Sequence, residues 1–204
     1  MSQPTNRQAT IPLPGKLDSK LKEFWADNPW RIVAGGHNLS SFERNRFFLN
    51  RDGVAFLEAS HISGTDSDGD GRAAVAADLF HSGKMDLIVR QSGGGPLLVY
   101  ENQFSNGKSL QIRLAGKGGS RQGIGARVTA EFGGKRVVRE NYPANTYASQ
   151  TQAIIHIGTG DEDLIKRLQI RWPSGTIQTL ENIPAGGLVE IREGEAGFAP
   201  VQVE

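Results

Sequence analysis

Alternating apolar and polar residues in the C-terminal half constrain the fold of this 204-residue chain more than any other feature. Every second side chain is apolar in the run SLQIRLA at 109–115, and the same period recurs in ARVTAEF at 126–132 and RLQIRW at 167–172. Alternate side chains of a β-strand point to opposite faces, so a period of two allows one face to be buried. The three runs therefore predict half-buried strands.

The same alternation predicts which side chains face the interior. The predicted inward residues are Leu110, Ile112, Leu114, Val128, Phe132, Leu168, Ile170 and Trp172. The predicted outward residues are Gln111, Thr129 and Glu131 together with Arg113, Arg127, Arg167 and Arg171. The four arginines favour scattered surface charge that aids solubility, and a shared basic face for an anionic glycan or phosphate is the alternative.

Turn-forming residues separate the predicted strands. They occur at 133–134 (GG), 143–145 (PAN), 158–160 (GTG), 173–175 (PSG) and 184–187 (PAGG). Glycine permits positive φ and proline fixes φ, which a chain needs where it reverses direction. With 26 glycines and only 7% aromatic residues, this pattern predicts an all-β fold whose C-terminal part is a β-sandwich or barrel.

The beginning of the chain has a different pattern. Residues 1–16 are polar and contain several prolines, which predicts a flexible leader. Apolar side chains then recur at helical spacing at Leu17, Leu21, Phe24 and Trp25. One short N-terminal helix is therefore predicted.

A weaker β pattern follows. The run 45–60 contains Asp52-Gly53 between apolar residues and predicts a β-hairpin, and 97–102 repeats the pattern after a distance typical of a propeller blade. Short apolar runs at 73–78 and 85–89 predict inner strands. Because a closed propeller needs about four to eight blades, we expect partial propeller-like blades. Their unpaired edges favour self-association or a cover supplied by the N-terminal helix.

Five motifs in the C-terminal half resemble, in order and spacing, the ASPIC/UnbV domain. They are GIGARV at 123–128, YASQ at 147–150, HIGTG at 156–160, WPSG at 172–175 and LENIP at 180–184. The resemblance implies that residues 109–193 form this β domain, followed by a tail at 194–204. The chain departs from the family pattern at Thr159, where an apolar residue is usual.

The preceding segment, 17–108, resembles the last blades of an FG-GAP (VCBS-like) propeller. Such blades precede the ASPIC/UnbV domain in secreted proteins of the cartilage acidic protein type. The residues that carry this resemblance are 45–50, 52–53, 70–72, 78–87 and 100–102. It implies an extracellular or periplasmic location, although the first thirty residues lack the apolar core of a signal peptide.

Two acidic loops are candidate calcium sites, and calcium is the one cofactor expected. Asp66, Asp68 and Asp70 alternate around a glycine turn, and carboxylates in this pattern supply several of the roughly six to eight oxygens that calcium takes. A solvated acidic turn without an ion is the alternative. The second loop resembles the FG-GAP calcium loop through Asp78 and Asp86, with Phe80 and Ser82 standing where acids are expected.

Composition excludes several classes of function. The chain has no cysteine, which excludes disulfides, thiolate metal sites and cysteine nucleophiles. A net charge of +1 gives no global attraction to nucleic acid, and no apolar run reaches the ~18 residues of a membrane span. We therefore expect neither a nucleic-acid partner nor a membrane span. No G-x-S-x-G motif or paired histidine spacing occurs, and no catalytic residue is predicted.

The resemblance implies a non-enzymatic module for binding, adhesion or scaffolding, with a protein or a glycan as its partner. The alternative is an enzyme or an accessory protein of natural-product biosynthesis, which the UnbV name implies. That alternative needs a pocket lined by the candidate ligand-binding residues Tyr147, Ser149, Gln150 and His156, which equally suit a structural corner. A third possibility is an interface module that completes a larger propeller in a partner.

Overall fold

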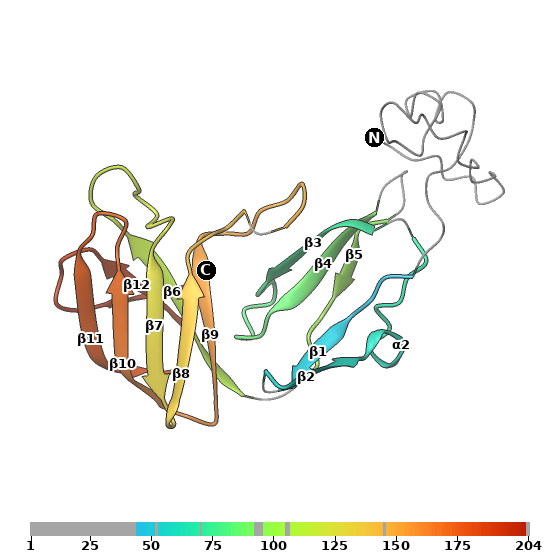
Figure 1. Cartoon of the computed structure of the whole chain (residues 1–204), viewed down its shortest axis with the longest axis horizontal. Helices are drawn as coiled ribbons and strands as arrows, with labels where there is room; N and C mark the ends of the chain where they lie inside the picture. Colours follow the sequence, from blue (N-terminus) through green and yellow to red (C-terminus); the bar gives the residue numbers. More distant parts are fainter. Residues whose placement is uncertain are drawn as a thin grey trace, which may run out of the picture. The chain divides into compact units, whose positions relative to one another are not determined.

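The computed structural model describes residues 44–51, 53–69, 71–91, 96–104, 107–144 and 146–202 (Figure 1). Strands make up nearly all the regular structure in these ranges, and the only helix described is the four-residue turn α2 (Ser60–Ser63). The all-β prediction is therefore confirmed. The predicted leader and the predicted N-terminal helix lie outside the described residues.

The chain divides into two compact units. One comprises Met1–Ala74 and Val89–Tyr100, and the other comprises Val75–Ile88 and Glu101–Glu204. The boundary passes through strands β3 (Gly71–Ala77) and β4 (Asp86–Gln91). The segment 75–88 thus belongs with the C-terminal unit.

The predicted hairpin is formed by β1 (Phe48–Arg51) and β2 (Ala55–Glu58), which pair antiparallel. Asn50 stabilises its turn, because its side-chain oxygen accepts a hydrogen bond of 2.8 Å from the backbone N–H of Gly53. A second sheet has the order β3-β4-β5, with β5 spanning Leu98–Tyr100. Of the two runs predicted as inner strands, β4 is central, whereas β3 lies at the edge of this sheet.

Sheets of two and three strands are smaller than the four-stranded blade of a propeller. The propeller-like interpretation of this half stays a prediction.

The C-terminal unit contains two four-stranded sheets (Figure 1). The first has the order β11-β10-β7-β8 and the second β13-β12-β6-β9. Their strands are β6 (Lys108–Ala115), β7 (Arg127–Phe132), β8 (Lys135–Glu140), β9 (Ile154–Gly160), β10 (Leu164–Arg171), β11 (Ile177–Pro184), β12 (Leu188–Arg192) and β13 (Ala199–Val201). All pairings are antiparallel except that of β12 with β6, which is parallel.

One hydrophobic core joins the two sheets. All eight side chains predicted to face inward are buried in it, with further residues from β9, β11 and β12. Because two separate sheets share this core, the arrangement is sandwich-like and not a closed barrel.

Thr129 differs from its prediction. It is on the outer face as expected, but it is only 9% exposed. Its strand β7 lies between β10 and β8, and the register places Gln169 and Val138 directly beside it. Neighbours on both sides therefore shield a short side chain even on the outer face of a sheet.

Two of the family-like motifs contact each other at one end of the core. Gly123 has a φ of +63°, and a Cβ there would lie 2.7 Å from Leu114 Cβ and 3.2 Å from Trp172 Cζ3. A Cβ at Gly125 would make only an ordinary van der Waals contact with Pro173 Cγ, at 3.6 Å. Gly123 of GIGARV therefore lets the backbone approach the tryptophan of WPSG.

We predict that Gly123→Ala destabilises the C-terminal unit more than Gly134→Ala does. Both glycines have positive φ, but nothing lies within 4 Å of a Cβ added at Gly134. The Gly134 variant should lose about 1 kcal/mol from backbone strain alone. The Gly123 variant should lose about 3 kcal/mol, because overpacking against Leu114 adds to the strain. Urea unfolding of both variants measures the difference, and equal losses would contradict the packing argument.

Candidate functional site

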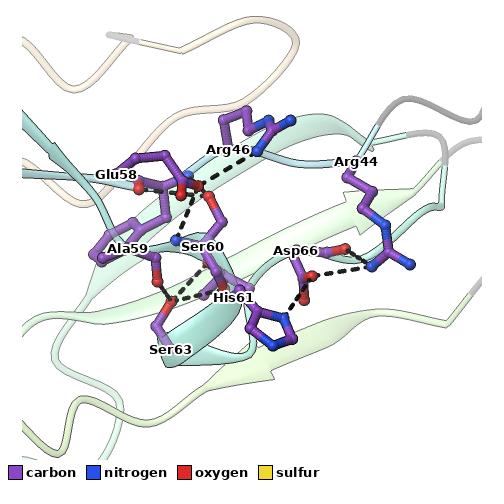
Figure 2. Close-up of polar contacts among 10 residues, drawn as sticks. Arg44, Arg46, Glu58, Ala59, Ser60, His61, Ser63 and Asp66 are labelled. Carbon is purple, nitrogen blue, oxygen red and sulfur yellow. Dashed lines mark hydrogen bonds and ion pairs between the residues drawn. The ribbon is translucent and has the colours of Figure 1, made fainter.

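The first acidic loop is held by basic side chains of its own unit. The guanidinium of Arg44 donates to Asp66 Oδ2 and to the backbone oxygen of Asp66, each at 3.0 Å. His61 Nδ1 lies 3.4 Å from the same Oδ2, and Figure 2 shows Arg44 and His61 approaching the carboxylate from different sides. The hydrogen bond with His61, followed by the charge of Arg44, lowers the pKa of Asp66.

A second network anchors the turn α2 to the hairpin (Figure 2). The backbone N–H of Phe47 donates to Ser60 Oγ at 2.7 Å, and the N–H of Ser60 donates to Glu58 Oε1 at 3.2 Å. Arg46 forms an ion pair of 3.5 Å with the same oxygen of Glu58. The hydrogen bond from Ser60 is the main reason why the pKa of Glu58 is lowered. These groups satisfy backbone donors and are structural.

The described residues do not by themselves form a calcium site. No three His, Asp or Glu side chains within the described ranges gather closely enough to hold a metal ion. One oxygen of Asp66 already faces two basic groups, and Asp68 also has an interaction partner. Asp70 lies outside the described residues, so calcium binding at this loop stays a prediction.

Both carboxylates of the second loop accept hydrogen bonds from backbone amides. Asp78 Oδ1 accepts from the N–H of Ser82 and Oδ2 from that of Gly83, each at 2.9 Å. Asp86 is buried, and its two oxygens accept from the N–H groups of Leu79 and Asn102, also at 2.9 Å. All four oxygens therefore already accept an amide hydrogen bond, and calcium binding at this loop stays a prediction.

The loop 78–86 also lies against the outer face of the second sheet. Gln111 Nε2 donates to Asp78 Oδ2 at 2.6 Å, and Ser109 Oγ donates to Gly83 O at 2.6 Å. His156 Nε2 lies 2.8 Å from the same Gly83 oxygen and must donate to it, because a carbonyl only accepts. His156 is therefore a structural contact of this loop.

We predict that Asp86→Ala lowers the free energy of unfolding by about 3 kcal/mol, because two backbone donors lose a charged acceptor. Asp161→Ala is the matched control, since Asp161 is exposed in a turn, and it should change stability little. Thermal unfolding with and without EDTA measures both effects. A variant as stable as the control would contradict the role of Asp86, and destabilisation of the wild type by EDTA would argue for a bound ion.

The predicted ligand-binding residues are only partly brought together. Tyr147, Ser149 and Gln150 lie in the segment between β8 and β9, which projects from the sheets (Figure 1), whereas His156 is within β9. The backbone N–H of Thr151 donates to Pro143 O at 2.9 Å and closes the base of this loop. Because His156 is engaged by Gly83, no pocket that joins all four is supported.

Two exposed tyrosines lie on this loop. Tyr147 is 78% exposed and Tyr142 is 60% exposed. Thr146 and Ser149 flank the tip, where they form an isolated β-bridge and a hydrogen bond between their hydroxyl groups. Ala148 between them has a φ of 51°, a conformation that is strained for alanine. The bridge and the hydrogen bond between Thr146 and Ser149 thus fix the backbone on both sides of Tyr147, whose side chain is exposed.

The WPSG motif belongs to a buried polar network that the sequence did not reveal. Trp172 Nε1 donates to Gln178 Oε1 at 2.9 Å, and Gln178 Nε2 donates to the backbone oxygens of Arg192 and Glu195. The nearby Glu193 is buried and accepts from the hydroxyl of Ser174 and from the N–H of Lys117, the latter at 2.7 Å. A lone Gln and a lone Glu carry no signal in the sequence.

The outward arginines do not form a basic face. Arg127, Arg167 and Arg171 share the outer face of the first sheet, whereas Arg113 is on the second sheet. The register aligns Ile177, Arg171, Arg127 and Glu140 in one row and Glu181, Arg167, Glu131 and Arg136 in another. Acids alternate with arginines in the second row, whereas Arg171 and Arg127 are direct neighbours in the first row, which ends at Glu140. With Arg113 on the other sheet, the four arginines do not gather on one face.

We predict that Glu193→Gln weakens the dependence of stability on acidic pH. The hydroxyl of Ser174 and then the N–H of Lys117 lower the pKa of Glu193 from its ordinary value of 4.5. The carboxylate therefore stabilises the fold fully above the unfolded pKa, and this contribution is lost as the pH falls through the folded pKa. Urea unfolding from neutral pH to pH ~3 should show that the difference in free energy of unfolding between the wild type and the variant shrinks. A difference that stays constant with pH would contradict the prediction, and Glu131→Gln on the outer face is the control.

No helix within the described ranges has the length and apolar character that crossing a membrane demands.

Comparisons with known proteins give a family match, in the C-terminal unit. A search of the curated proteins finds no match to this chain. The family match begins directly after β6, although Leu110, Ile112 and Leu114 of that strand are part of the same core. Residues 116–197, about two fifths of the chain, match the family described as ASPIC and UnbV.

Proposed function

We propose that the C-terminal unit is a non-enzymatic binding module that recognises an uncharged glycan through the loop 141–151. One observation carries this proposal. Of the five family-like motifs, YASQ at 147–150 presents its aromatic side chain to solvent, whereas the tryptophan of WPSG is buried in the core and the histidine of HIGTG contacts Gly83. A side chain with no packing role in the unit is free to contact a partner.

The chemistry of the loop suits a sugar surface. A tyrosine ring offers a flat apolar face for a pyranose ring, and its hydroxyl can exchange hydrogen bonds. Ser149 and Gln150 add donors and acceptors beside Tyr147. The positive φ of Ala148 supports a role beyond packing, because strained backbone tends to occur where function requires a fixed geometry.

The charge of the loop favours a neutral ligand. Residues 142–151, YPANTYASQT, include no charged side chain. An acidic glycan would need arginine or lysine beside the tyrosines, and the segment 142–151 supplies neither. A neutral glycan needs no such compensation.

An enzyme receives less support than a binding module. The catalytic alternative needs His156 beside Tyr147 and Ser149, and His156 instead donates to Gly83 O. We expect the protein outside the cell or in the periplasm. This expectation rests on the resemblance to the ASPIC and UnbV family, and residues 116–197 match that family. Adhesion and scaffolding are both consistent with a module of this kind.

We predict that Tyr147→Ala weakens binding to a neutral polysaccharide about tenfold, since the loss of one stacked ring corresponds to roughly 1.4 kcal/mol. Binding of the full chain would be measured on immobilised cellulose, chitin and dextran, with heparin as the acidic comparison. Tyr147→Phe should retain most of the affinity if stacking dominates.

Leu164→Ala is the control, because Leu164 is an exposed apolar residue at the opposite end of the first sheet. Binding should change little when the salt concentration rises. Binding to heparin alone, or neutral-glycan binding that Tyr147→Ala leaves intact, would contradict the proposal.

A further inference from the structure

The hairpin β1–β2 has apolar side chains on both of its faces. Register pairs Leu49 with Leu57 on one face, and the other face carries Phe48 opposite Glu58 and Phe56 opposite Asn50. Phe48 is 52% exposed and Phe56 is 69% exposed. The two phenylalanines are diagonal neighbours, so their rings belong to one apolar patch, which we call the Phe48/Phe56 face.

An uncovered Phe48/Phe56 face is energetically unfavourable. A two-stranded hairpin alone is marginally stable in water and gains stability when a further element packs on its apolar face. Large exposed aromatic side chains that are neighbours on one sheet face mark an interaction surface. The polar residues Arg46 and Glu58, which form an ion pair, lie beside this face and would form its rim.

We propose that residues 17–30 of the same chain cover the Phe48/Phe56 face. This segment precedes β1 and lies outside the described residues. Its apolar side chains Leu17, Leu21 and Phe24 recur three to four residues apart, and Trp25 adjoins them. That spacing places apolar side chains on one side of a helix, where they can contact an apolar sheet face.

The connection between the two is long enough. Phe48 follows Trp30 by 18 positions, and a chain of that length spans up to roughly 60 Å. A tether of this kind gives an effective concentration in the millimolar range. The tethered segment therefore has an advantage over a second copy of the chain, whose concentration is much lower.

The absence of cysteine makes a direct test simple. Trp25→Cys and Phe56→Cys would be combined in the full chain, which contains no other thiol, and treated with a short bis-maleimide at low protein concentration. We expect a cross-link within one chain. Trp25→Cys with Leu57→Cys is the control pair, because Leu57 is exposed on the opposite face of the same hairpin, and it should give less cross-link.

Hydrogen exchange provides a second readout that needs no cysteine. Phe24→Ser with Trp25→Ser should speed the exchange of amides in 44–58 at least about tenfold and leave those of 109–193 unchanged. A cross-link between two chains would show that a second copy covers the face and would overturn the proposal. Absence of any cross-link together with unchanged exchange would also overturn it, and a separate partner would then be the occupant to seek.

Discussion

Close contact between two apolar sheet faces is the constraint on which the C-terminal unit depends. Trp172 reaches the edge of the core, where Leu114 and the backbone of Gly123 lie against it. Its indole N–H is buried and needs an acceptor, which Gln178 provides. The motif residues that define the domain are thus largely the residues that let the sheets approach and leave no polar atom of this tryptophan unpaired.

Three acidic residues of the C-terminal unit organise backbone. Asp78 and Asp86 look in the sequence like cation ligands, yet amide N–H groups surround them. Glu193 plays the same part near the WPSG turn. A loop without regular structure leaves amides without partners, and a carboxylate with two oxygens can accept from several of them. Fold stability and ligand binding therefore compete for the same oxygens.

The aromatic residues of the two proposals differ in chemistry. Tyr142 and Tyr147 lie on a loop with its own hydrogen bonds and carry polar hydroxyls, which suits reversible binding of a partner. Phe48 and Phe56 have no polar group and lie on a small hairpin, which suits a permanent cover. Side-chain chemistry thus distinguishes the proposed recognition surface around Tyr147 from the Phe48/Phe56 face, for which we propose a cover.

The sequence by itself determined strands β6, β7 and β10, their buried faces and the hairpin, because these depend on local spacing. A period of two fixes which face Leu110 or Ile170 occupies, and Asp52-Gly53 favours a reversal. Only the tertiary structure decided that β12 pairs parallel with β6, that Thr129 is shielded, and that His156 contacts Gly83 and not the tyrosine loop. Those outcomes depend on which strands, distant in the sequence, become neighbours in the fold. The spacing of residues along the chain does not specify these pairings.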